Sequence, residues 1–242
     1  MGTVLAVAAA GCGSHREQTT SITVFASASL IKTFTEIGKR FKSADPGRSV
    51  EFIFASSSAL AGELTGGASA DVFAAGDLPD MDTVVRAGLV TAPPVNFASN
   101  KLAIAVAPGN PKRITSFADL NRPGLRVEVC APPGFCASDL RHIEDKAGVQ
   151  LPAATAVATT RDVLNDVVTG KADAGLVYTT DALDAGDNIS WFEFPEAADA
   201  GATYSIALLK QSDQVQSASM FIELVTGNSG QQILRQAGFT KP

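Results

Sequence analysis

Two short serine-rich stretches hold the residues best suited to bind an anion. Residues 25–29 read FASAS and residues 54–58 read FASSS; each follows a short apolar run and precedes a segment with helical spacing. This order predicts Ser29 and Ser57 or Ser58 at helix N-caps, where free N–H groups and the positive end of the helix dipole point outward. Together the stretches predict an anion site, although each serine alone is explained by ordinary helix capping.

A catalytic serine is a competing interpretation of the same residues. The sequence has two histidines, His15 close to the N-terminus and His142 in a predicted helix among charged residues, so neither is placed as a general base. It contains no GxSxG, Walker or HExxH motif. Asp71, Asp77 and Asp181 fall at strand ends and helix starts, where capping explains them. We therefore expect a binding protein and no enzyme; a purely structural role for both stretches is a further alternative.

The three cysteines, Cys12, Cys130 and Cys136, point to export. Residues 3–13, TVLAVAAAGCG, have the pattern of a secretory apolar segment that ends in a bacterial lipobox, with Cys12 as the acyl acceptor. Lipidation of Cys12 leaves Cys130 and Cys136 to form a disulfide, which should stabilise the fold by roughly 2 kcal/mol. Two thiols and two histidines make a poor zinc site. We expect an exported lipoprotein on the extracytoplasmic face of the membrane, held there by its N-terminal lipid.

Composition limits the remaining function classes. The 242 residues are 45% hydrophobic and 18% charged, which is typical of a packed globular protein. The net charge of −6 and the lack of a Lys/Arg cluster argue against binding to nucleic acid. No apolar run reaches the 18 residues that a membrane-spanning helix needs. An anionic ligand must therefore be held by local groups.

The elements that would position the serines alternate between strand and helix. Strands are predicted at 22–26, 50–55 and 70–75, each followed by a helix, and a second series of strands and helices begins at 101–108. The closing helices at 213–238 are expected to pack on the first series. This predicts an α/β fold of two doubly wound lobes with a central cleft and two hinge crossings, near 98–101 and 203–206. The predicted boundaries are 1–20 for the signal, lipobox and tether, 21–99 plus 206–242 for lobe I, and 100–205 for lobe II.

With FASAS, FASSS, SADVFAAGD, LVYTTDA and QILRQAGF in this order, residues 20–240 resemble the molybdate-binding components of bacterial ABC importers. That family has the type II periplasmic binding protein fold. The resemblance implies a receptor that captures molybdate or tungstate between two lobes and delivers it to ABC permease subunits, without a cofactor and as a monomer. A receptor for sulfate or another tetrahedral oxyanion is the alternative, and a serine hydrolase is less favoured.

The resemblance also implies which groups bind the anion. They are the hydroxyls of Ser29, Ser57 and Tyr178 and the backbone amides of Val163 and Cys136, with Ala137 as the alternative to Cys136. Arg161 is expected to flank the site. A neutral shell made only of donors suits a fully ionised oxyanion, whose oxygens can only accept hydrogen bonds. Phosphate, which keeps a proton near neutral pH, would leave an O–H unpaired in such a shell, whereas sulfate must be excluded by size.

Overall fold

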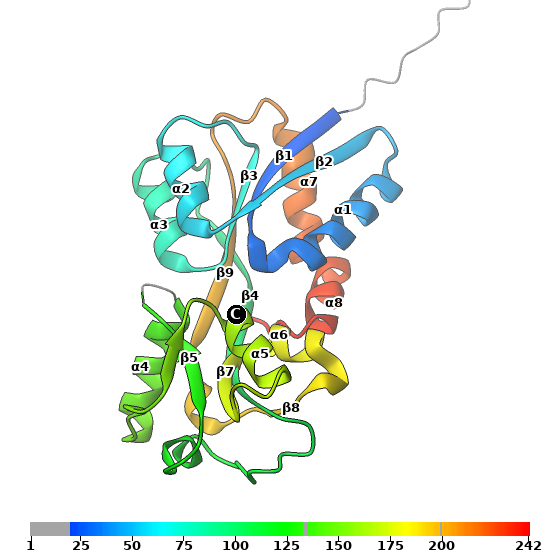
Figure 1. Ribbon diagram of the computed structural model, residues 1–242. Coiled ribbons are helices and arrows are strands. Elements are labelled where there is room, and N and C mark those ends of the chain that lie inside the picture. Colours follow the sequence, from blue (N-terminus) through cyan, green and yellow to red (C-terminus); the bar gives the residue numbers. More distant parts are fainter. Residues whose placement is uncertain (1–19, 133–134, 199) are drawn as a thin grey trace, which may run out of the picture.

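The computed structural model describes residues 20–132, 135–198 and 200–242. The predicted lipidation site Cys12 and His15 lie outside the described residues. Within them, nine strands form one mixed sheet, in the order β2-β1-β3-β9-β4-β7-β5-β6, with β8 paired to β4. Helices cover both faces of this sheet, which curls so that the molecule has two halves (Figure 1). The predicted α/β class is confirmed.

The first half begins with three parallel strands that alternate with helices. Its elements are β1 (Thr20–Ser27), the 3₁₀ turn η1 (Ala28–Leu30), α1 (Ile31–Ala44), β2 (Arg48–Ala55), α2 (Ser57–Thr65), β3 (Val72–Ala75) and α3 (Leu78–Arg86). The strands β2 and β3 pair with β1 in parallel register, Ala26 lying opposite both Phe54 and Ala74. Because parallel strands end at the same edge, the segments that follow all three lie together.

The second half contains the remaining parallel strands. Its elements are β4 (Val95–Val106), η2 (Ala118–Asn121), β5 (Val127–Cys130), α4 (Phe135–Ala147), β6 (Thr155–Val157), α5 (Thr160–Val168), β7 (Ala174–Tyr178), α6 (Thr179–Ala185), η3 (Gly186–Asn188), β8 (Ser190–Phe192) and η4 (Pro195–Ala197). The chain then returns to the first half through β9 (Gly201–Leu208), α7 (Val215–Thr226) and α8 (Asn228–Gln236). Two of these elements, β6 and α6, were not predicted from the sequence.

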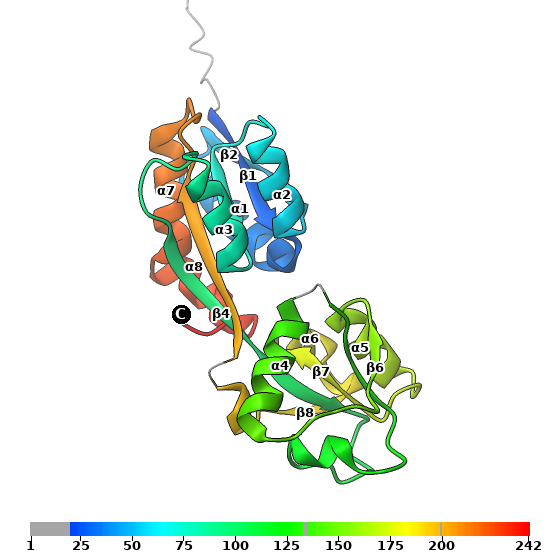
Figure 2. The same cartoon turned by 90° about the vertical axis from the view of Figure 1, so that its left-hand side faces the viewer.

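Two antiparallel strands connect the halves. β4 pairs with β9 from Val95 opposite Ile206 to Lys101 opposite Gly201, and then continues into the second half, where Leu102 lies opposite Tyr178. The predicted crossings fall within this paired segment, which runs between the two halves in Figure 2. The halves therefore share one continuous sheet.

Each half has its own hydrophobic core. In the first, the Phe34 ring lies 5.9 Å from the ring of Phe221 in α7 and 5.9 Å from that of Phe97 in β4. This confirms that the closing helices pack on the first half. In the second, the rings of Phe117 and Phe194 stack at 5.6 Å in a cluster that includes Cys130 and Cys136.

The predicted disulfide between Cys130 and Cys136 is confirmed, with the two Cα atoms 6.0 Å apart. It ties the end of β5 to the first turn of α4. The loop between strand and helix is therefore closed covalently at the edge where ligands bind in sheets of this type.

Candidate functional site

The two serine stretches meet around Gly76, at the end of β3. Ser57 Oγ accepts a hydrogen bond of 2.9 Å from Gly76 N. A Cβ atom added to Gly76 would lie only 2.8 Å from Ser27 Oγ, and Ser27 Oγ lies 3.0 Å from Ser29 Oγ. Hydroxyls from the end of β1 and from the start of α2 therefore converge on one residue. The two stretches lie at the same edge of the sheet.

The predicted capping roles need a correction. Ser56 is the N-cap of α2, since its Oγ accepts from Ala59 N at 3.2 Å, and Ser57 is the first residue of the helix. Ser29 lies inside η1, and Leu30 is the N-cap of α1. The N-cap positions predicted for Ser29 and for Ser57 or Ser58 are wrong because the chain enters each helix at a different residue. As a result, neither the Ser29 hydroxyl nor the Ser57 hydroxyl caps a helix.

Sequence reasoning missed Tyr204, which contacts this serine cluster. Its hydroxyl donates to Ser29 Oγ at 3.0 Å. The ring is 3% exposed and packs edge-on against Phe239 and Phe97, with centroids 5.1 and 6.2 Å apart. Burial raises the pKa of this phenol. Its position in a strand predicted at a hinge crossing was the only signal in the sequence.

Asp77 is a buried carboxyl near Ser57. It accepts from Asp80 N at 2.8 Å as the N-cap of α3, and the Ser57 hydroxyl lowers its pKa. Burial raises the pKa of Asp77 to about 7, and the neighbouring carboxyl of Asp80 acts in the same direction. Below that pH Asp77 carries a proton, which keeps the negative charge beside Ser57 small.

In the second half, Tyr178 lies at the end of β7. Its hydroxyl donates to Asp139 Oδ2 at 3.2 Å, and its ring packs against residues of both hydrophobic cores. Burial raises the pKa of Tyr178. Burial also raises the pKa of Asp139, while the Tyr178 hydroxyl, His142 and the amide of Gly201 oppose that rise. Tyr178 thus lies where the two halves meet, next to the first turn of α4.

The amides predicted at α4 belong to its first turn. Cys136 and Ala137 are the second and third residues of the helix, and their side chains are buried. The first N–H groups of a helix have no partner within it, so both amides are suited to an external acceptor. The choice between Cys136 and Ala137 stays a prediction.

The amide of Val163 is engaged inside α5. Val163 N donates to Thr159 O at 3.2 Å, and the Val163 side chain is fully buried. A capping box between Thr159 and Asp162 begins this helix. The N–H groups of the first two residues, Thr160 and Arg161, come before the first hydrogen bond within the helix. The role of Val163 as a ligand stays a prediction, and its amide would have to leave Thr159 to fulfil it.

Side chains at the start of α5 connect it to the start of α6. Thr160 Oγ1 donates to Asp181 Oδ2 at 2.8 Å, and Arg161 forms an ion pair of 3.6 Å with the same carboxylate through an exposed side chain. Burial raises the pKa of Asp181, although these two partners oppose the rise. Arg161 therefore has a carboxylate partner, which fits a residue that flanks the site. Among the described residues, no group of three or more His, Cys, Asp or Glu side chains could hold a metal ion.

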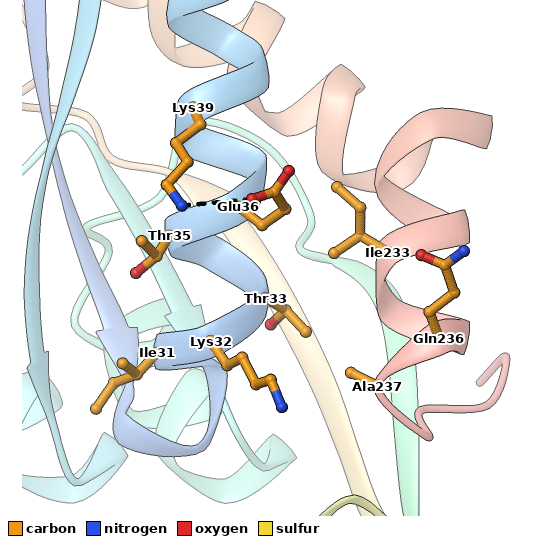
Figure 3. A pocket seen from close by; sticks show the side chains of 9 residues that line it. All are labelled: Ile31, Lys32, Thr33, Thr35, Glu36, Lys39, Ile233, Gln236 and Ala237. Carbon is orange, nitrogen blue, oxygen red and sulfur yellow. Dashed lines mark ion pairs between the residues drawn. The ribbon is translucent and has the colours of Figure 1, made fainter. Parts of the chain in front are cut away.

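A pocket between α1 and α8 lies apart from the serine cluster (Figure 3). Its lining includes Ile31, Glu36 and Gln236, with Lys39 paired to Glu36 at 3.6 Å. Lys32, at its edge, forms an exposed ion pair with Asp184 of α6. Neither Ser29 nor Ser57 is among the lining residues.

Two halves joined by two antiparallel strands, with hydroxyls and helix starts where they meet, define the class of the type II periplasmic binding proteins. Residues 22–240 match the family model described as bacterial extracellular solute-binding protein, and the chain belongs to this family. The described residues include no helix long and apolar enough to cross a membrane.

Individual relatives agree with this class. The chain is 51% identical over 222 residues to the molybdate-binding protein ModA of Mycobacterium tuberculosis (strain ATCC 25618 / H37Rv), covering 92% of this chain and 85% of that protein. The structure of the sulfate-binding protein SubI from Mycobacterium tuberculosis H37Rv matches with a TM-score of 0.77 at 21% identity, covering 92% of this chain and 87% of SubI. That of the Azotobacter vinelandii periplasmic molybdate-binding protein matches with a TM-score of 0.73 at 17% identity, covering 91% and 99% of the two chains. These homologues are solute-binding proteins of transport systems rather than enzymes.

Proposed function

We propose that the protein is an extracytoplasmic receptor that captures molybdate or tungstate between its two halves and delivers it to an ABC permease. The observation that carries the proposal is the convergence of three hydroxyl groups near Gly76: those of Ser29 in η1, Ser57 at the start of α2 and Tyr204 in β9. The 51% identity to a molybdate-binding protein supports the choice of oxyanion.

The donors have the chemistry that a fully ionised oxyanion requires. Ser29, Ser57 and Tyr178 each carry one hydroxyl proton, and the first turns of α4 and α5 supply backbone N–H groups. Tyr178 gives its proton to Asp139 in this structure. Binding of the anion therefore requires that the Tyr178 hydroxyl turn from the carboxylate to the ligand, which accounts for part of the cost of closing the two halves.

Sulfate is the second candidate ligand, because it has the same charge and shape and a sulfate-binding protein shares this fold. Phosphate is disfavoured, since its remaining proton needs an acceptor in the site. The carboxyls of Asp77 and Asp139 lie near the predicted ligand groups, but Asp139 already accepts from Tyr178 and Asp77 from Asp80 N.

Calorimetric titration of the purified chain with molybdate, tungstate, sulfate and phosphate tests the proposal. We expect both metal oxyanions to bind, with sulfate at least about a hundredfold weaker. Ser29→Ala and Ser57→Ala should each weaken molybdate about tenfold or more, as expected for loss of a hydrogen bond to a charged ligand. Ser58→Ala, in the same stretch but exposed, is the matched control. Sulfate binding as tightly as molybdate would reassign the ligand.

The proposal also includes a lipid anchor and a monomeric state. Lipidation at Cys12 would hold the receptor at the extracytoplasmic face of the membrane, beside its permease. Mass spectrometry of the protein isolated from membranes tests this anchor, and a Cys12→Ser variant released into the medium would support it. We also propose a monomer, which sedimentation of the soluble chain with and without molybdate tests.

A further inference from the structure

A chain of hydrogen bonds connects the serine cluster to the second half of the molecule. Tyr204 of β9 donates to Ser29 Oγ at 3.0 Å. Asn100 of β4 donates through Nδ2 to Thr180 Oγ1 at 2.9 Å, and its side chain is near enough to the Tyr204 hydroxyl to lower the pKa of that phenol. Asn100 is 1% exposed and Tyr204 is 3% exposed. This series of side chains thus runs through the two strands that join the halves, β9 and β4, and ends in the first turn of α6.

The hydrogen bonds in this series have a defined donor direction. The Asn100 amide has two N–H groups: one donates to Thr180, and the other is available to the nearby Tyr204 hydroxyl. A tyrosine hydroxyl has a single proton, and Tyr204 donates it to Ser29. Ser29 Oγ then accepts from Tyr204, and its own proton remains for Ser27 or for a ligand. The chain therefore presents Ser29 as a hydrogen-bond donor.

The ring of Tyr204 cannot easily leave this position. It packs edge-on against Phe239 and Phe97, and its Cε1 atom lies 3.3 Å from a Cβ built on Gly76. Any side chain larger than hydrogen at Gly76 would press on both Tyr204 and Ser27. The orientation of the phenol is thus set by packing, and its proton is directed to Ser29.

We propose that Tyr204 and Asn100 are positioning residues of the anion site, which act through Ser29 by forcing its hydroxyl to donate to the ligand. The inference rests on the proposed function and deepens it. Because Ser29 already accepts from Tyr204, its own proton is directed to a ligand oxygen that can accept, and an oxyanion without a proton presents such an oxygen in every orientation. Tyr204 and Asn100 need not touch the anion themselves.

The same hydrogen bonds attach the start of α6 to β4, one of the two strands that join the halves. Thr180 lies two residues after Tyr178, the predicted ligand of the second half, and Thr179 Oγ1 donates to Lys101 O at 3.0 Å. The start of α6 is therefore attached to β4 at two neighbouring positions. Removal of the Asn100 amide is expected to loosen the donor direction at Ser29 without removing a ligand.

A double-mutant cycle tests whether Tyr204 acts through Ser29. Molybdate, tungstate and sulfate are titrated into the full chain and into Tyr204→Phe, Ser29→Ala, the double variant and Asn100→Leu. Tyr204→Phe keeps the ring packing and is expected to weaken molybdate about tenfold, and Asn100→Leu about threefold. Because Tyr204 acts only through Ser29, the double variant should bind as Ser29→Ala does. Thr226→Val is the matched control, since that hydroxyl bonds only carbonyls of its own helix.

The outcomes separate this inference from the proposed function. If the unaltered chain binds none of the three anions, both are overturned. If it binds molybdate and Tyr204→Phe binds equally well, only the inference is overturned. Full addition of the Tyr204→Phe and Ser29→Ala effects would also overturn it, because Tyr204 would then act independently of Ser29. Should Tyr204→Phe fail to fold in thermal melting, Asn100→Leu alone and combined with Ser29→Ala provides the same cycle, and unaltered affinity there overturns the inference.

Discussion

Replacement of Asp77 by asparagine should change how the stability of the fold depends on pH. Asn keeps the acceptor oxygen for Asp80 N and for the Ser57 hydroxyl, and it removes the titrating carboxyl. The folded protein holds a proton at Asp77 up to a pKa of about 7, whereas the ordinary value is 3.8. The stabilising contribution of that proton is fully present below about pH 4 and is lost as the pH rises through 7.

The magnitude follows from the size of the rise in pKa. The difference between 3.8 and about 7 corresponds to roughly 4 kcal/mol if each pKa unit contributes in full. Water penetration and rearrangement of side chains weaken such effects even at buried sites, so we expect about 2 kcal/mol. Relative to the unaltered chain, Asp77→Asn should gain this amount in free energy of unfolding between pH 4 and pH 8.

Urea unfolding followed by circular dichroism at pH 4, 6 and 8 measures the difference. Asp82→Asn is the matched control, because Asp82 is an exposed carboxylate on the same helix. The other carboxyls titrate in both proteins and cancel in the comparison. A difference between the two proteins that stays constant from pH 4 to pH 8 would refute the assignment of the bound proton to Asp77.

Three further predictions concern the fold. Replacement of both Cys130 and Cys136 by alanine should lower the free energy of unfolding by about 2 kcal/mol through the lost loop closure, and unchanged urea unfolding would contradict this. Gly175→Ala should lower the free energy of unfolding by about 2 kcal/mol or more, because the new Cβ would lie 2.2 Å from Val163 Cγ1 and 2.8 Å from Glu128 O. Gly62→Ala, which has open space around the new Cβ, is the control. Equal effects of the two substitutions in thermal melting would contradict this prediction. Phe221→Ala should cost about 4 kcal/mol, since Phe221 is fully buried among Phe34, Phe41 and Phe52; a loss below about 1 kcal/mol in urea unfolding would show that the core closes over the cavity.

The local elements of the first half could be predicted because their signals are local. Asp77 and Pro79 mark the start of α3, and the apolar runs before each serine stretch mark β1 and β2. By contrast, α6 follows β7 without an intervening residue, and β6 has only three residues, none of them buried. Neither element leaves a break or a periodic pattern that a reading of the sequence can detect.

The candidate site was only partly predictable for a related reason. The serines could be predicted as candidate ligands from their position next to strand ends. The contact between Ser29 and Tyr204 could not, because it joins residues 175 positions apart. The contact between Tyr178 and Asp139 spans 39 positions. Which hydroxyl donates to which group depends on how β4 and β9 bring the two halves together, and no spacing in the sequence encodes that arrangement.

The return of β9, α7 and α8 to the first half also determines the order in which the protein can fold. Phe34 is surrounded by Phe52, Phe97 and Phe221, so the core around α1 is incomplete until nearly the whole chain is available. The β3 strand likewise obtains its second neighbour only from β9. Such contacts between distant segments slow folding. The second half, whose elements are contiguous in sequence, is free to form earlier and would then serve as the scaffold on which the first half closes.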